Sequence, residues 1–217
     1  MSDLAKVLAV GVCIGVAASI LRDRLNVDPV TGESADTPDL EDYTMQALDS
    51  AEGLFVEGDD MNRDAFLKAI RVGEGTSGSD GYLILVGGGR AQSYDTHPAL
   101  AGWGGWQMPL AMAQKAGYPN GAVSTAAGAF QVKRATWTRV ASKLGITDFT
   151  PASQDAVAWE LIGEKGAQTD VLSGRIPEAL YKVRKVWASL PGAGYGQREV
   201  SLPDFLRYYQ AAGGVLA

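Results

Sequence analysis

Apolar residues recur at helical spacing through most of the chain beyond residue 60. The first such stripe consists of four residues: Phe66, Leu67, Ile70 and Val72. Asn62 is the predicted N-cap of this helix, and Gly73 and Gly75 are predicted to end it. Similar patterns predict four later helices, over residues 134–144, 151–165, 177–187 and 203–212. Thr150 and Pro151 fit the cap and first position of the second of these helices.

Two short runs between these helices have the composition of strands. Residues 81–86 and 90–94 flank three consecutive glycines and predict a β-hairpin. The next stretch, residues 99–123, is rich in Gly, Trp and Pro and predicts a long surface insertion. Its Trp103 and Trp106 fit either local packing or a platform on which sugars stack. The pattern as a whole predicts an α+β fold, mostly helical with one small hairpin or sheet.

The first sixty residues have a different pattern. Residues 7–21 carry no charge, yet as a helix they span only ~22 Å, short of the ~30 Å hydrocarbon core of a membrane. Residues 4–21 therefore predict a marginal membrane segment: a retained anchor, which we favour, a cleaved signal peptide or a buried core helix. We expect three parts: a membrane or signal-anchor segment (1–24), an acidic linker (25–60) and a catalytic domain (61–217).

Charge is segregated along the chain. Residues 1–60 hold 13 acidic and 3 basic side chains, whereas residues 61–217 hold 12 acidic and 16 basic ones. A mildly basic domain suits an anionic polymer such as cell wall, but its basic excess is too small to predict nucleic-acid binding. Cys13 and His97 are the single cysteine and the single histidine, so we expect no zinc site and no cofactor. His97 is predicted to be structural.

Glu74 is the candidate catalytic acid. It falls where the first predicted helix ends, and the helix dipole there disfavours a carboxylate anion and raises its pKa. Such a shift suits a group that must donate a proton near neutral pH. A solvated glutamate near the helix end is the alternative. A small-residue loop, residues 124–131, follows some fifty residues later and ends in the amide of Gln131.

Five motifs occur in one order along the chain. They are Glu74-Gly-Thr, Tyr94-Asp-Thr-His-Pro, Ser124-Thr-Ala-Ala-Gly-Ala-Phe-Gln, Asp148-Phe-Thr-Pro-Ala-Ser-Gln-Asp-Ala-Val and Trp187-Ala-Ser-Leu-Pro-Gly-Ala-Gly-Tyr-Gly-Gln. Together they resemble the lambda-type lytic transglycosylases, a family of phage endolysins, over residues 62–214. The resemblance implies a lysozyme-like fold and cleavage of the peptidoglycan bond between N-acetylmuramic acid and N-acetylglucosamine. The membrane segment and the linker lie outside it.

The same resemblance implies roles for individual residues. Glu74 protonates the glycosidic oxygen and then takes the proton of the muramic acid C6 hydroxyl, which attacks its own C1 and leaves a 1,6-anhydro end. Ser124, Thr125, Gln131 and Tyr195 are the candidates for positioning the sugars. For Tyr195 a role in packing, and for Ser124 and Thr125 a role in a turn, are the structural alternatives.

Two other functions stay open at this point. An inverting hydrolase needs a second carboxylate across the cleft from Glu74, and Asp80 and Asp95 are the nearest candidates. A non-catalytic wall-binding module needs no acid at all. The resemblance implies that the catalytic domain acts outside the cytoplasm, so we expect a membrane-anchored protein whose domain faces the periplasm, or a lysis factor in a virion membrane.

Overall fold

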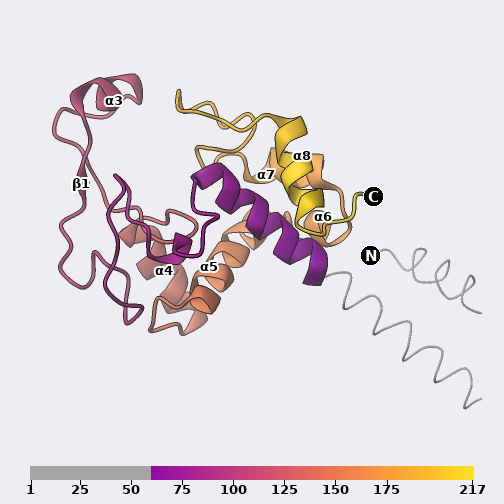
Figure 1. Ribbon diagram of the computed structural model, residues 1–217, viewed down its shortest axis with the longest axis horizontal. Helices are drawn as coiled ribbons and strands as arrows, with labels where there is room; N and C mark the ends of the chain where they lie inside the picture. The colour runs from indigo at the N-terminus through magenta and orange to yellow at the C-terminus, as the bar shows by residue number, and fades with distance from the viewer. Residues whose placement is uncertain (1–59) are drawn as a thin grey trace, which may run out of the picture. The chain divides into compact units, whose positions relative to one another are not determined.

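The structure, a computed structural model, describes residues 60–217. The first helix covers residues 60–74 and crosses the middle of the fold (Figure 1). Most of its apolar stripe is buried, and Val72 is half-buried. Ala65, Phe66, Ala69 and Ile70 on this stripe are fully buried. The helix is thus held by packing along one face, as the spacing of its apolar residues predicts.

Asn62 is not the N-cap of this helix, because residues 60 and 61 are already helical. Its buried side chain instead joins the first helix to the C-terminal part of the fold. The amide nitrogen donates to the carbonyl of Leu172 at 2.9 Å. The amide oxygen accepts from the Tyr209 hydroxyl at 2.6 Å and from the Val215 backbone at 2.8 Å. The cap prediction was therefore wrong: the amide satisfies distant partners and not the helix end.

The later helices lie where their sequence patterns place them. They are α4 (Arg134–Leu144), α5 (Pro151–Gly163), α7 (Ile176–Val183) and α8 (Leu202–Ala211), and a short α6 (Gln168–Leu172) lies between α5 and α7. Thr150 caps α5 by accepting from the Ser153 backbone at 3.3 Å, with Pro151 in the first position. These helix predictions are confirmed, except that α7 ends at Val183 and a turn leads on to Trp187.

The hairpin predicted over residues 81–94 is only partly confirmed, because the chain reverses there without forming two regular strands. Residues Gly81–Leu83 form a 3-10 turn, η1, and the return is a single bridge between Ile84 and Arg90. Gly81 packs closely on the preceding turn: a Cβ atom there would stand 1.7 Å from the carbonyl oxygen of Thr76. The small sheet instead pairs β1 (Trp106–Gln107) with β2 (Val123–Ser124), antiparallel, with Trp106 opposite Ser124.

The stretch predicted as a surface insertion forms an arm, which we define as residues 99–124. It contains β1, the short helix α3 (Leu110–Lys115) and β2, and Figure 1 shows α3 at its far end, away from α7 and α8. Its tip exposes apolar side chains, with Leu110 48% and Met112 46% exposed. This arm is one side of the cleft described below.

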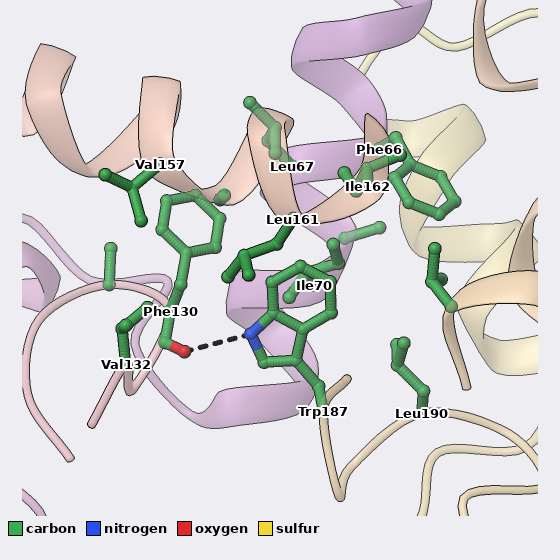
Figure 2. Packing of buried hydrophobic residues seen from close by; sticks show 14 of the residues in the cluster. Phe66, Leu67, Ile70, Phe130, Val132, Val157, Leu161, Ile162, Trp187 and Leu190 are labelled. Atoms are coloured by element: carbon green, nitrogen blue, oxygen red, sulfur yellow. Dashed lines mark hydrogen bonds between the residues drawn. The ribbon is translucent and has the colours of Figure 1, made fainter. Parts of the chain in front are cut away.

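The hydrophobic core brings the first helix, α5 and the later loops together (Figure 2). Phe66 and Ile70 lie near Leu161 and Ile162 of α5. The Trp187 indole donates to the carbonyl of Phe130 at 2.9 Å, which ties the 124–131 loop to the segment after α7. Fully burying a side chain such as Phe66 or Ile70 contributes about 1.5–3 kcal/mol to the stability of the fold.

Within residues 60–217, no helix is long and apolar enough to cross a membrane. The predicted membrane segment (1–24) and all but the last residue of the predicted linker (25–60) lie outside the described residues. Those predictions therefore stay predictions.

Candidate active site

A cleft of about 430 Å³ separates the arm from the helical body. Glu74 lines it at the end of the first helix, and the arm contributes Trp106, Met112 and Tyr118. Most of the remaining lining comes from the 122–133 loop and residues 185–197, and Phe130 and Trp187 belong both to this lining and to the hydrophobic core. The site is thus assembled from segments far apart in the sequence.

Glu74 is the last residue of the first helix and is largely shielded from water. Burial raises the pKa of its carboxyl, and hydrogen bonds from the Ser189 hydroxyl and the Ser189 backbone oppose that shift. The hydroxyl donates to Oε1 at 2.5 Å. The position at the helix end and the direction of the pKa shift are as predicted from the sequence. The main cause of the shift is burial and not the helix dipole.

The turn after Glu74 is held by the arginine one turn earlier in the same helix. The Arg71 guanidinium donates to the carbonyls of Thr76 at 3.0 Å and Gly78 at 3.3 Å. It also lies 4.3 Å from the centre of the Tyr82 ring, whose hydroxyl donates to the Asp155 carboxylate at 2.9 Å. Thr76 in turn donates to the carbonyl of Ala129. These bonds fix the backbone on which Glu74 is carried.

Gln131 lines the cleft from a strained backbone position. Its φ is +46°, in the left-handed region that residues other than glycine rarely adopt. Its side-chain nitrogen donates to the carbonyls of Ile84 at 3.2 Å and Gly128 at 2.9 Å. With both amide hydrogens committed to the backbone, the carbonyl oxygen is the atom left for a ligand.

A second glutamine, Gln154 of α5, holds the loop from behind. Its amide oxygen accepts from the Ala129 backbone at 2.8 Å, and its nitrogen donates to the carbonyls of Phe149 and Tyr82. A Cβ atom on Gly128, whose φ is +76°, would stand 2.1 Å from that oxygen. The small residues of the loop therefore allow α5 to approach closely.

The other predicted positioning residues divide into two groups. Ser124 and Tyr195 line the cleft together with Glu74 and Gln131. Ser124 is buried, and the Tyr195 hydroxyl donates to the carbonyl of Lys185 at 2.9 Å. Thr125 is not among the residues that line the cleft: its hydroxyl accepts from the Arg134 backbone at 3.1 Å and supports the start of α4.

Neither rival carboxylate lines the cleft. Among the cleft residues of the described region, 60–217, Glu74 is the one that carries a carboxylate. Asp80 forms an ion pair with Arg90 on the surface, and its side chain is 55% exposed. Asp95 is also exposed, in the turn after Ser93.

His97 is structural, as predicted. Its buried ring packs against Trp137 and Phe149, with ring centres 6.0 Å and 5.1 Å away. Nε2 lies 3.0 Å from the carbonyl of Val132, and Nδ1 accepts from the Ala99 backbone at 3.2 Å. One nitrogen thus donates and the other accepts, which is the neutral imidazole, and burial lowers its pKa accordingly.

The structure separates the two tryptophans of the arm. Trp103 packs against the core, whereas Trp106 lines the cleft. The Trp106 ring lies directly on Gly87: a Cβ atom there would be 2.3 Å from Cδ1 of the indole, and the φ of Gly87 is +87°. Gly87 therefore allows both the turn and the close packing of Trp106.

The sequence did not predict the contact of Trp106 with Gly87. It also did not predict the contact of Ser189 with Glu74, although Ser189 lies inside the last quoted motif.

The comparisons with known proteins decide the family. The sequence pattern of the endolysin family matches residues 64–216. The endolysin of Escherichia phage P2 is 39% identical over 167 residues, which cover 72% of this chain and 96% of the relative. The endolysin of Escherichia phage lambda is 35% identical, over 71% of this chain and 92% of the relative. The chain belongs to the endolysin family.

Solved structures agree on the fold of this endolysin. Bacteriophage lambda lysozyme complexed with a chitohexasaccharide has a TM-score of 0.61 and 34% identity, covering 72% of this chain and 97% of the other. Lysozyme from bacteriophage lambda has a TM-score of 0.59 and 33% identity, with the same coverage. The endolysin thus has a lambda-lysozyme-like fold, mostly helical with a two-stranded sheet.

Proposed function

We propose that this endolysin cleaves peptidoglycan as a lytic transglycosylase, with Glu74 as its catalytic acid. The observation that carries the proposal is the isolation of Glu74: its carboxyl is shielded, has a raised pKa and is the one carboxyl that residues 60–217 contribute to the cleft lining. Membership of the endolysin family and the sugar complex of lambda lysozyme support a glycan as the substrate. The activity serves phage lysis or penetration of the cell wall.

One carboxyl performs both proton transfers. Glu74 donates its proton to the glycosidic oxygen as the bond from that oxygen to C1 of N-acetylmuramic acid breaks. The resulting carboxylate takes the proton of the C6 hydroxyl, whose oxygen bonds to C1 and closes the 1,6-anhydro ring. The nucleophile belongs to the sugar itself, so proximity supplies much of the acceleration and no second carboxylate is needed. Glu74 ends the cycle protonated again.

The surroundings of Glu74 fit this double role. Burial keeps the carboxyl protonated at higher pH than an ordinary glutamate, while the Ser189 hydroxyl stabilises the carboxylate formed after the first transfer. Ser124, Gln131 and Tyr195 are proposed to orient the sugars from the cleft wall. Thr125 is proposed to act indirectly, because its hydroxyl accepts a hydrogen bond from the first residue of α4.

The alternative functions make different demands. An inverting muramidase requires a second carboxylate about 6.5–9.5 Å from the acid, and Asp80 or Asp95 would have to reach the cleft to supply it. A wall-binding module has no use for a carboxyl whose pKa burial has raised. The three-part organisation, with a membrane segment over residues 1–24, stays our proposal for how the enzyme is delivered.

Three matched variants separate these functions. In a turbidity-clearing assay on permeabilised cells, Glu74→Gln is expected to reduce lysis at least ~100-fold, because it removes the general acid. Asp80→Asn and Asp95→Asn are expected to keep it within about threefold, since surface substitutions of this kind change little. A loss with either aspartate variant as large as that with Glu74→Gln would favour the two-carboxylate hydrolase.

A further inference from the structure

Two lysines line the same cleft as Glu74. Lys133 stands just before α4, and Lys185 lies in the turn after α7. No ion pair of residues 60–217 includes either of them. The cleft thus holds two ammonium groups and one carboxyl, and burial favours the neutral form of that carboxyl. Its lining is cationic.

Each ammonium is placed over a tyrosine ring instead of an acid. The Lys133 nitrogen lies 5.5 Å from the centre of the Tyr118 ring, and the Lys185 nitrogen lies 5.2 Å from that of Tyr195. Both tyrosines line the cleft, and each is 43% exposed. A ring face attracts a cation but does not neutralise it, so the charge stays available to an anionic ligand.

The two lysines differ in what else they do. Lys185 also donates to the carbonyl of Ala193 and so supports the loop that carries Tyr195. The Lys133 nitrogen makes no hydrogen bond to any described residue, and all three of its hydrogens remain for a ligand. Lys133 is therefore the cleaner test of a binding role.

We infer that Lys133, with Lys185, binds carboxylates of the substrate, so that the cleft recognises the acidic side groups of the muramic acid residues as well as the sugar rings. This inference rests on the proposed function, because it names what the same cleft binds. A chitin strand carries no carboxylate, whereas each muramic acid carries a lactyl carboxylate or a peptide stem with its own. Unpaired cations in a cleft raise the local concentration of such anions and fix their register.

Binding to the full chain carrying Glu74→Gln tests the inference without turnover. Isothermal titration compares three ligands of equal length: a neutral chitin oligosaccharide, an amidase-stripped glycan with free lactyl carboxylates, and a peptide-bearing glycan. Lys133→Met is expected to raise the Kd of a carboxylate-bearing ligand roughly three- to tenfold more than that of chitin. Lys133→Arg is expected to restore most of the affinity, because the charge is kept.

Lys68→Met is the matched control, since Lys68 is exposed on the first helix and does not line the cleft. It removes the same charge and is expected to leave the ratios between the Kd values of the three ligands unchanged. Loss with the stripped glycan assigns Lys133 to the lactyl group, and loss confined to the peptide-bearing glycan assigns it to the stem. Equal weakening of all three ligands, or of none, would overturn the inference. A failure of the transglycosylase proposal would appear instead in the reaction products.

Discussion

The two sides of the cleft differ in how far their side chains are exposed to water. On the helical side, Glu74 is shielded by the core, and Ser189 and Trp187 beside it are 8% and 4% exposed. On the arm, Leu110, Met112 and Tyr118 are between 43% and 48% exposed. The buried side can shift a pKa and hold a carboxyl in place, and the exposed side offers apolar and aromatic surface to a polymer. We propose that the buried side holds the acid and that the arm adds to the substrate contacts made by Gln131 and Tyr195.

The connection between the two sides is local and depends on small residues. Trp106 of the arm lies on Gly87, and the 124–131 loop returns from the arm to the core through Gly128 and Gln154. The arm is therefore held by close backbone approach together with the packing of Trp103 against the core. Removing a buried side chain on the helical side should therefore affect stability more than removing a half-buried one on the arm.

The largest expected difference in stability lies between the two tryptophans of the cleft. Trp187→Ala removes a buried ring and its bond to the Phe130 carbonyl, and should lower the free energy of unfolding by about 3–5 kcal/mol. Trp106→Ala should cost only ~1–2 kcal/mol, because its ring is half-buried, but should raise KM about tenfold through lost sugar contact. Urea unfolding and initial rates measure both. Equal losses of stability would remove the distinction between the two sides.

A smaller effect is expected at Ser189. Ser189→Ala removes a hydrogen bond that lowers the pKa of Glu74, so the pKa should rise further and the basic limb of the kcat/KM profile should move to higher pH. The rate at the optimum should fall roughly tenfold, because the carboxylate form loses a donor. Ser189→Thr keeps a hydroxyl and is the control. An unmoved basic limb would show that Ser189 does not act on Glu74.

The smallest expected effect is a gain in thermal stability in Glu74→Gln. Because the folded state raises the pKa of Glu74, it binds the proton more tightly than the unfolded chain does, and this stability is lost as pH rises through the folded pKa. Glu74→Gln removes the buried ionisation, so its Tm should exceed that of the wild type at about pH 7 and match it near pH 4. Calorimetry at the two pH values checks this. A constant difference would mean that burial of the charge is not the cause.

The sequence predicted most of the helical side and less of the arm. The 3.6-residue spacing of Phe66 and Ile70, and the glycines that follow, were enough to place Glu74 at a helix end. Its bond to Ser189, 115 residues away, is a product of tertiary packing that no local pattern encodes. The larger cause of the pKa shift was missed for the same reason.

The errors at the sheet have a similar origin. Residues 81–86 have the composition of a strand, but Gly81 packs on the Thr76 carbonyl and the chain coils into η1. The real strands hold two residues each, too few for an alternation of apolar and polar positions to show.

Thr125 differs from Ser124 by one position, which in an extended segment turns its side chain to the other face.

The most direct test of the central claim is the origin of the new sugar end. Purified peptidoglycan is digested in water enriched in oxygen-18, and the products are analysed by mass spectrometry. A transglycosylase that uses Glu74 alone should give 1,6-anhydromuramic ends without the heavy isotope, because the C6 oxygen of the sugar closes on C1. Reducing muramic ends that contain oxygen-18 would show attack by water, and would contradict the single-carboxyl mechanism.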